Sequence, residues 1–282
     1  MPIKSTATVI AALALALAAT AALGVEAQWQ EGYSARTRMI AGNVDQDGAA
    51  RPYAFVEIEL AKGWKTYWRN PGDAGGVPPN FNWSRSANLG SARVLYPAPH
   101  RLSDEAGDNI GYKDAVTFPV AVEPKDPSKP VVLALDLQFG ICKDICVPSE
   151  AAIDLEIPAG TAAGAAAPES VKVLDRVPRE GAKRRANDPV LKRAAIDATG
   201  AKPKIVLEAS FPGGAKGADV FLEAPDGLYI PMPRMVPAAA GDDRAFETEL
   251  GPLLEIKDLE GKTLEATLVS DQGQSIVSFT RD

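Results

Sequence analysis

Hydrophobic and polar positions alternate with a period of two along much of the sequence. Such alternation places successive side chains on opposite faces of an extended chain, so each run predicts a β-strand. Clusters of Gly, Pro, Asn and Asp separate the runs, which is typical of antiparallel sandwiches and barrels. The predicted strands are 54–60, 116–122, 131–139, 152–157, 204–211, 219–224, 245–250, 263–270 and 275–280. The pattern therefore predicts an all-β protein.

A change in composition divides these strands into two groups. Residues 158–168 are almost entirely Ala, Gly, Thr and Pro, which is typical of a flexible linker. The segment 169–176 fits a short helix, and the Gly-containing loop 271–274 predicts a hairpin turn. We therefore expect two β-sandwich domains. The expected division is 1–27 signal peptide, 28–158 first domain, 159–186 Ala/Gly/Pro-rich linker and 187–282 second domain.

The first 27 residues have the pattern of a secretory signal peptide. Lys4 is the only charged residue before Glu26, and the residues between them are mainly Ala, Leu, Val and Ile. The run ends in Val25-Glu26-Ala27, with small residues where a signal peptidase reads the chain. An uncleaved anchor is the alternative, because the run is long enough to span a bilayer. We expect cleavage after Ala27 and export to the periplasm.

Charge and composition exclude several functions. The net charge of -7 and the pI near 5.0 argue against a nucleic-acid partner, which needs clustered Lys and Arg. No phosphate-binding loop is present, and His100 is the one histidine, with no nucleophile motif beside it. Outside the two cysteines, the sequence therefore predicts no cofactor and no metal site.

The chemistry of the sequence is concentrated in its two cysteines, Cys142 and Cys146. Three residues separate them, a common length for a hairpin loop, and facing residues of a hairpin have Cα atoms about 5.5 Å apart, within disulfide range. A bridge there can open and close with little backbone movement. Three interpretations remain open: a redox-active pair, a static disulfide that tightens a hairpin, and a soft-metal site for Cu(I) or Zn.

Several motifs between residues 33 and 158 resemble a known family. They are 63–75 (GWKTYWRNPGDAG), 96–99 (YPAP), 111–114 (GYKD), 118–120 (FPV) and 139–148, which holds both cysteines. This region resembles the N-terminal periplasmic domain of the thiol reductase DsbD. It is closer still to the DsbD-like domain of suppressor-of-copper-sensitivity B proteins, which connects the chain with copper tolerance.

The resemblance implies an immunoglobulin-like fold and a redox cycle at Cys142 and Cys146, with Cys146 as the attacking thiol. Electrons would arrive from a membrane electron-transfer protein or a thioredoxin-like protein and pass to oxidised periplasmic proteins. The activity favoured is that of a protein-disulfide reductase. The alternative is a non-catalytic periplasmic module, for copper tolerance or protein docking, with a structural disulfide.

The sequence departs from the DsbD pattern in three respects. The DsbD domain has a longer stretch between its cysteines. It also shields them with an aromatic residue after an acidic pair, whereas here Asp104 and Glu105 precede Ala106 and Gly107. The full-length relatives continue into membrane helices and a thioredoxin domain, so we expect this chain either to find these parts on separate proteins or to serve another role.

Other residues have a structural and a functional interpretation. The aromatic stretch from 64 to 83 forms core, surrounds the cysteines or docks a partner, and core is favoured. Arg69 and Asp73 lie in a Gly- and Pro-rich loop and either line a site or shape a turn. The aromatic residues are Trp64, Tyr67, Trp68, Phe81 and Trp83.

Overall fold

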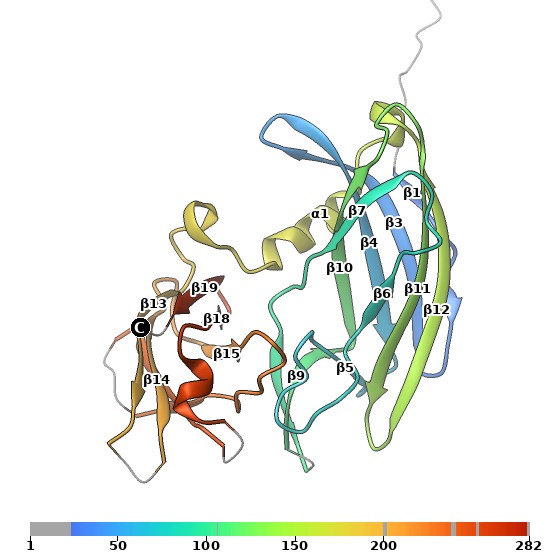
Figure 1. Cartoon of the computed structure of the whole chain (residues 1–282). Helices are drawn as coiled ribbons and strands as arrows, with labels where there is room; N and C mark the ends of the chain where they lie inside the picture. The colour runs from blue at the N-terminus through green and yellow to red at the C-terminus, as the bar shows by residue number, and fades with distance from the viewer. Residues whose placement is uncertain (1–23, 106, 200–201, 238–240, 252–253, 281–282) are drawn as a thin grey trace, which may run out of the picture.

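The chain folds into four antiparallel sheets that form two sandwiches (Figure 1). The computed structural model describes residues 24–105, 107–199, 202–237, 241–251 and 254–280. The prediction of an all-β protein with two immunoglobulin-like sandwiches is confirmed. Most of the predicted signal peptide, residues 1–23, lies outside the described ranges. Its last residues are described, and they pair with the first sandwich as strand β1.

The first sandwich consists of two sheets. One has the order β1-β3-β4-β10-β7, with β2 also paired to β3, and the other has the order β12-β11-β5-β9-β8, with β6 also paired to β11. The strands of the first sheet are β1 (Val25–Glu26), β2 (Gln30–Glu31), β3 (Ala35–Gln46), β4 (Ala49–Leu60), β7 (Leu89–Val94) and β10 (Ala115–Pro124). Those of the second are β5 (Lys65–Tyr67), β6 (Asn80–Asn82), β8 (His100–Asp104), β9 (Gly107–Lys113), β11 (Val131–Cys142) and β12 (Cys146–Ile157).

Alternate residues of these strands fill the first core. Leu133, Leu135 and Leu137 of β11 point inward and are fully buried. Phe118 of β10 is also fully buried, and its ring meets those of Phe81, Tyr96 and Tyr112 edge-to-face, with centroids 5.2–5.6 Å apart. Such edge-to-face pairs add to the burial of apolar area, so Phe118 is central to this core.

The second sandwich is smaller. Its sheets have the orders β13-β14-β17-β16 and β15-β18-β19. The predicted hairpin is present, because Val269 and Gln274 are register partners across its turn. The strands are β13 (Val190–Asp197), β14 (Lys204–Ser210), β15 (Asp219–Glu223), β16 (Arg234–Val236), β17 (Asp243–Glu249), β18 (Thr263–Val269) and β19 (Gln274–Thr280), with a 3₁₀ turn η4 (Ile256–Leu259).

The Ala/Gly/Pro-rich segment is fixed along the first sandwich, whereas its composition predicts flexibility. Asn43 donates its backbone N–H to Gly164 (2.8 Å) and accepts one from Ala166 (2.8 Å). Gly42 permits this approach, because a Cβ there would lie 2.7 Å from the Ala166 Cα. The segment contains η1 (Gly160–Ala163), α1 (Pro168–Lys172), η2 (Val173–Arg176) and η3 (Gly181–Lys183). The predicted helix at 169–176 corresponds to α1 and η2.

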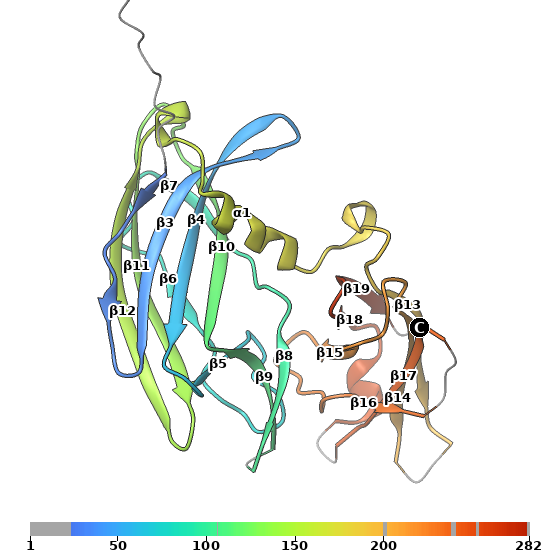
Figure 2. The same ribbon diagram turned by 180° about the vertical axis from the view of Figure 1, so that it is seen from behind.

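This segment explains why apolar residues are buried on both faces of β4. Tyr53 and Phe55 point away from the first core, yet both are buried against Ala166, Val171 and Leu174. Figure 2 shows α1 lying across the outer side of β4 and β10. Both faces of the sheet are covered at these positions, so this part of the strand carries apolar residues on each side.

The two sandwiches share an apolar and ionic interface. The first core includes Phe221, Met232 and Val269 of the second sandwich, and the Phe221 ring lies 5.9 Å from that of Trp68. Met232 therefore packs in this core. Around it, Arg69 pairs with Glu223 (2.5 Å) and Arg101 with Asp219 (2.8 Å). The second sandwich thus contributes side chains to the core of the first.

Candidate functional site: the Cys142–Cys146 hairpin

The two cysteines end β11 and begin β12 as register partners, and a disulfide joins them. The loop between them is Lys143, Asp144 and Ile145, as the spacing predicts. Their Cα atoms lie 4.1 Å apart, closer than the expected distance of about 5.5 Å. The bridge closes the tip of a hairpin at the lower end of the first sandwich in Figure 1.

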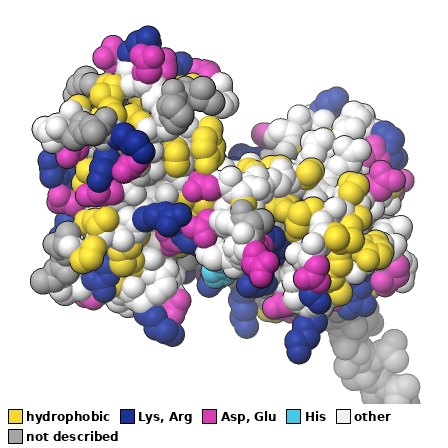
Figure 3. All heavy atoms as spheres, turned by 90° about the horizontal axis from the view of Figure 1, so that it is seen from below, with side chains coloured by type: hydrophobic (Ala, Val, Ile, Leu, Met, Phe, Trp, Pro, Cys, Tyr) yellow, Lys and Arg dark blue, Asp and Glu magenta, His cyan; other side chains and the backbone are white. Residues whose placement is uncertain are grey.

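The two cysteines differ in their exposure to solvent. Cys142 is 6% exposed, whereas Cys146 is an exposed residue. Ile145, next to Cys146, is also exposed, at 58%. Figure 3 views this end of the molecule from below, with patches of hydrophobic side chains between charged ones. An incoming group therefore meets Cys146 before Cys142.

Strand β5 supplies the neighbours of the disulfide. Lys65 is the register partner of Cys142 across β5 and β11. Tyr67 lies two residues further along β5, and Gly140 two residues earlier along β11, so both belong to the same face of the sheet as Lys65 and Cys142. This face is opposite to the one that packs in the first core.

The Tyr67 hydroxyl lies 3.6 Å from the Cys146 Sγ. A disulfide sulfur carries no hydrogen, so the hydroxyl is the donor. The ring fits between two glycines: a Cβ at Gly140 would lie 3.2 Å from it, and one at Gly76 would lie 2.2 Å from it. Burial and then the charge of Asp104 raise the pKa of Tyr67, which keeps the hydroxyl protonated.

A buried cation lies beside the disulfide. The Lys65 ammonium is hydrogen-bonded to the Asp104 carboxylate and to the Asn109 side-chain oxygen. Lys65 is 7% exposed and Asn109 is 3% exposed, so the carboxylate compensates a charge held largely out of water. The acidic residue Asp104 thus contacts the site through Lys65. Ala106, where the sequence lacks the aromatic cap, is outside the described ranges.

The structure separates the aromatic stretch into two groups. Trp64, Trp68, Phe81 and Trp83 lie in or against the first core, as favoured from the sequence. Tyr67 does not, and it is the aromatic residue at the sulfur. The sequence includes it among the candidates but gives no means of singling it out, because the contact depends on the pairing of β5 with β11. Arg69 and Asp73 lie at the interface with the second sandwich.

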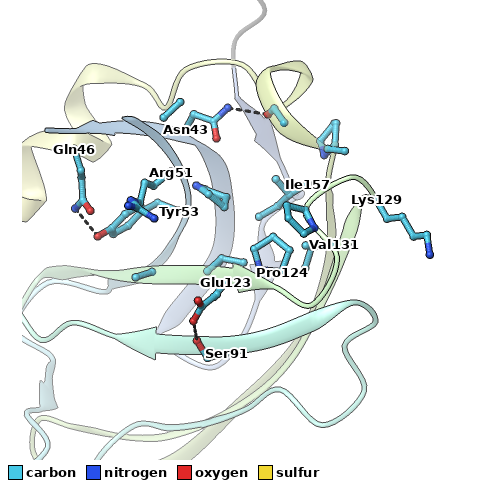
Figure 4. Close-up of a pocket in the computed structure, with 18 of the residues that line it drawn as sticks. Asn43, Gln46, Arg51, Tyr53, Ser91, Glu123, Pro124, Lys129, Val131 and Ile157 are labelled. Atoms are coloured by element: carbon cyan, nitrogen blue, oxygen red, sulfur yellow. Dashed lines mark hydrogen bonds between the residues drawn. The ribbon is translucent and has the colours of Figure 1, made fainter. Parts of the chain in front are cut away.

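A separate pocket of about 600 Å³ lies at the opposite end of the first sandwich (Figure 4). Val131 and Ile157, which face each other at the far end of the β11–β12 pair, line it together with Pro124, and Arg51 and Arg93 line its polar part. Val131 and Cys142 are the two ends of β11, eleven residue-to-residue steps apart, which is roughly 37 Å of extended strand. The pocket is therefore distinct from the disulfide site.

Two further observations concern only the described ranges. No three His, Cys, Asp or Glu side chains there come together as a metal site would require. Within the same residues, none of the helices has the length and apolar character needed to cross a membrane.

Comparison with known proteins gives a family match for the first sandwich. Residues 39–158 match the family described as thiol:disulfide interchange protein DsbD, N-terminal. The search of curated proteins gives no match.

Comparison with solved structures gives a match to both sandwiches. The crystal structure of the N-terminal periplasmic domain of ScsB from Proteus mirabilis has a TM-score of 0.67 at 20% identity, over 91% of this chain and 98% of that one. This likeness shows a shared fold. Bovine butyrophilin matches with a TM-score of only 0.22 at 7% identity, over 82% of this chain and 91% of that one, which is too low to support an argument. The resemblance predicted from the sequence is confirmed: residues 39–158, which carry both cysteines, match the DsbD N-terminal family.

Proposed function

We propose that the chain is a periplasmic thiol–disulfide interchange protein that relays electrons through Cys142 and Cys146. A membrane electron-transfer protein or a thioredoxin-like protein would supply the electrons, and oxidised periplasmic proteins would receive them. The observation that carries the proposal is a disulfide with one exposed and one buried cysteine at the tip of a hairpin. The signal-peptide pattern and the periplasmic origin of the ScsB domain support the location.

The proposed exchange has two half-reactions. A thiolate of the reduced partner attacks the Cys146 Sγ, the disulfide breaks, and Cys142 leaves as a thiolate that takes up a proton. The second thiolate of the partner then attacks the partner's sulfur in the mixed disulfide and releases Cys146 as a thiolate, which also takes up a proton. The partner is oxidised to a disulfide, and this chain gains two electrons and two protons. The reverse sequence, begun by the Cys146 thiolate, reduces a substrate disulfide.

A structural disulfide would add little to the stability of this hairpin. β11 and β12 are paired in continuous register along twelve residues of each strand. A bridge that closes so small a loop restricts the unfolded chain little, so its contribution to stability is small. Both considerations favour a redox role over a structural one.

The reduction potential of the Cys142–Cys146 pair tests the proposal. A pair that cycles is expected to have a potential above about -300 mV, because structural disulfides in exported proteins lie below that value. Equilibration of the full chain with graded dithiothreitol buffers, followed by alkylation and mass spectrometry, measures it. A potential below that limit would contradict the proposal and favour a structural disulfide.

Tyr67 is expected to stabilise the attacking thiolate. A Tyr67→Phe change removes the donor near the Cys146 Sγ and keeps the ring between the two glycines. In a Cys142→Ser background, alkylation of Cys146 by iodoacetamide at pH 7 should slow about fivefold, the effect of a hydrogen bond worth about 1 kcal/mol. The control is Tyr112→Phe, which removes a buried hydroxyl bonded to Pro97 on the core side. Equal rates for both variants would contradict this role.

A further inference from the structure

The loop that follows β5 is held by the second sandwich. The Asp73 carboxylate accepts hydrogen bonds from the Tyr229 hydroxyl (2.5 Å) and the Met232 N–H (2.8 Å). The Asn70 side chain donates to the Leu222 carbonyl (3.3 Å). These contacts join positions more than 150 residues apart in sequence, and all involve the segment that connects β5 with β6.

The other end of the same loop lies on the disulfide site. Gly140 donates its backbone N–H to the Val77 carbonyl (2.9 Å), and the Asn109 side chain donates to the Gly75 carbonyl (2.6 Å). Gly76 lies directly against the Tyr67 ring. The segment 70–77 therefore runs from the second sandwich to the residue whose hydroxyl faces Cys146.

The loop needs such anchors because of its own sequence. Gly72, Gly75 and Gly76 have φ values of +85°, +72° and +149°, in regions that other residues rarely adopt. Glycine loses more backbone freedom on ordering than any other residue, so the contacts around the loop must hold it in place. In the first sandwich, the Ile110 N–H donates to the Pro71 carbonyl, and the Ala74 N–H donates to the Asp108 carbonyl. Asp73 and Asn70 make the contacts with the second sandwich.

We propose that the second sandwich positions Tyr67 against Cys146 through Asp73 and the loop 70–77. Tyr229 and the Met232 N–H fix Asp73, the loop keeps Gly76 on the Tyr67 ring, and the ring directs its hydroxyl at the sulfur. Asp73 and Tyr229 are positioning residues that act through Tyr67 and do not touch the reacting atoms. The inference rests on the proposed function only in taking Cys146 as the attacking sulfur.

A double-mutant cycle tests this coupling. Tyr229→Phe keeps the ring and removes the donor to Asp73. In the full chain with Cys142→Ser, it should slow iodoacetamide alkylation of Cys146 about threefold, because part of the Tyr67 hydrogen bond is lost. In a chain that also carries Tyr67→Phe, the same change should leave the rate unaltered, because the hydroxyl is already absent. Asp73→Ala is the second variant and should behave in the same way.

The matched control is Asp219→Asn, which weakens an ion pair between the sandwiches, with Arg101, that lies outside the loop. It should keep the full alkylation rate, and circular dichroism should show that every variant is folded. Unchanged rates for Tyr229→Phe and Asp73→Ala, or equal slowing with and without Tyr67, would overturn the inference. The assay uses no partner and no potential, so it can fail while the reduction potential supports the proposed function, and the reverse also holds.

Discussion

A Cys142→Ser chain is expected to form a stable mixed disulfide with a partner protein, whereas a Cys146→Ser chain is not. Cys146 is exposed and faces a hydroxyl donor, while Cys142 is 6% exposed behind it. Exchange needs a thiolate that reaches the partner's sulfur in line with the bond that breaks, so burial of Cys142 removes most of its reactivity. The buried sulfur is then suited to resolving the mixed disulfide.

A defined probe measures this asymmetry. A thioredoxin-like protein with one remaining cysteine, blocked by thionitrobenzoate, gives a stable adduct when a thiolate attacks it and releases the coloured thionitrobenzoate. We expect Cys142→Ser to react at least about tenfold faster than Cys146→Ser. The chain with both cysteines replaced is the control for background release. Equal rates, or a faster Cys146→Ser chain, would refute the assignment of Cys146 as the attacking thiol.

Replacement of Phe118 by alanine is expected to lower the free energy of unfolding by about 3–5 kcal/mol. The ring is fully buried and meets three other aromatic rings, so its removal leaves a cavity and three edge-to-face contacts unmade. Equilibrium unfolding in urea measures the loss. The conservative Phe118→Leu keeps most of the volume and should cost clearly less. A loss below about 1 kcal/mol for the alanine variant would show that this core is loosely packed.

The alternation of apolar and polar residues predicts a strand correctly where one face of that strand is polar. The alternating runs at 131–139 and 263–270 correspond to β11 and β18. The alternation does not predict strands β3 (Ala35–Gln46) and β13 (Val190–Asp197). β3 combines Arg36 and Arg38 with a run buried on both faces, from Met39 to Gly42, and this mixture hides the period.

The sequence predicts only the part of the candidate site that is formed by residues close together in the chain. The spacing of Cys142 and Cys146 predicts the hairpin and its three-residue loop, because both depend on neighbouring residues. Tyr67 reaches Cys146 across 79 positions, and Asp73 reaches Tyr229 across 156. Such contacts depend on strand order and on the docking of two domains. The period of a single strand carries no information on either.

The shared core limits how far the first sandwich can be regarded as autonomous. Phe221, Met232 and Val269 complete its hydrophobic cluster, and Glu223 and Asp219 neutralise two of its guanidinium groups. A chain shortened to the DsbD-like part would expose Trp68 and leave Arg69 and Arg101 without these carboxylates. The shortened chain would therefore expose an apolar and positively charged surface that the second sandwich covers in the native protein. We therefore expect a chain with both sandwiches to be more soluble than one shortened to the domain that carries the cysteines.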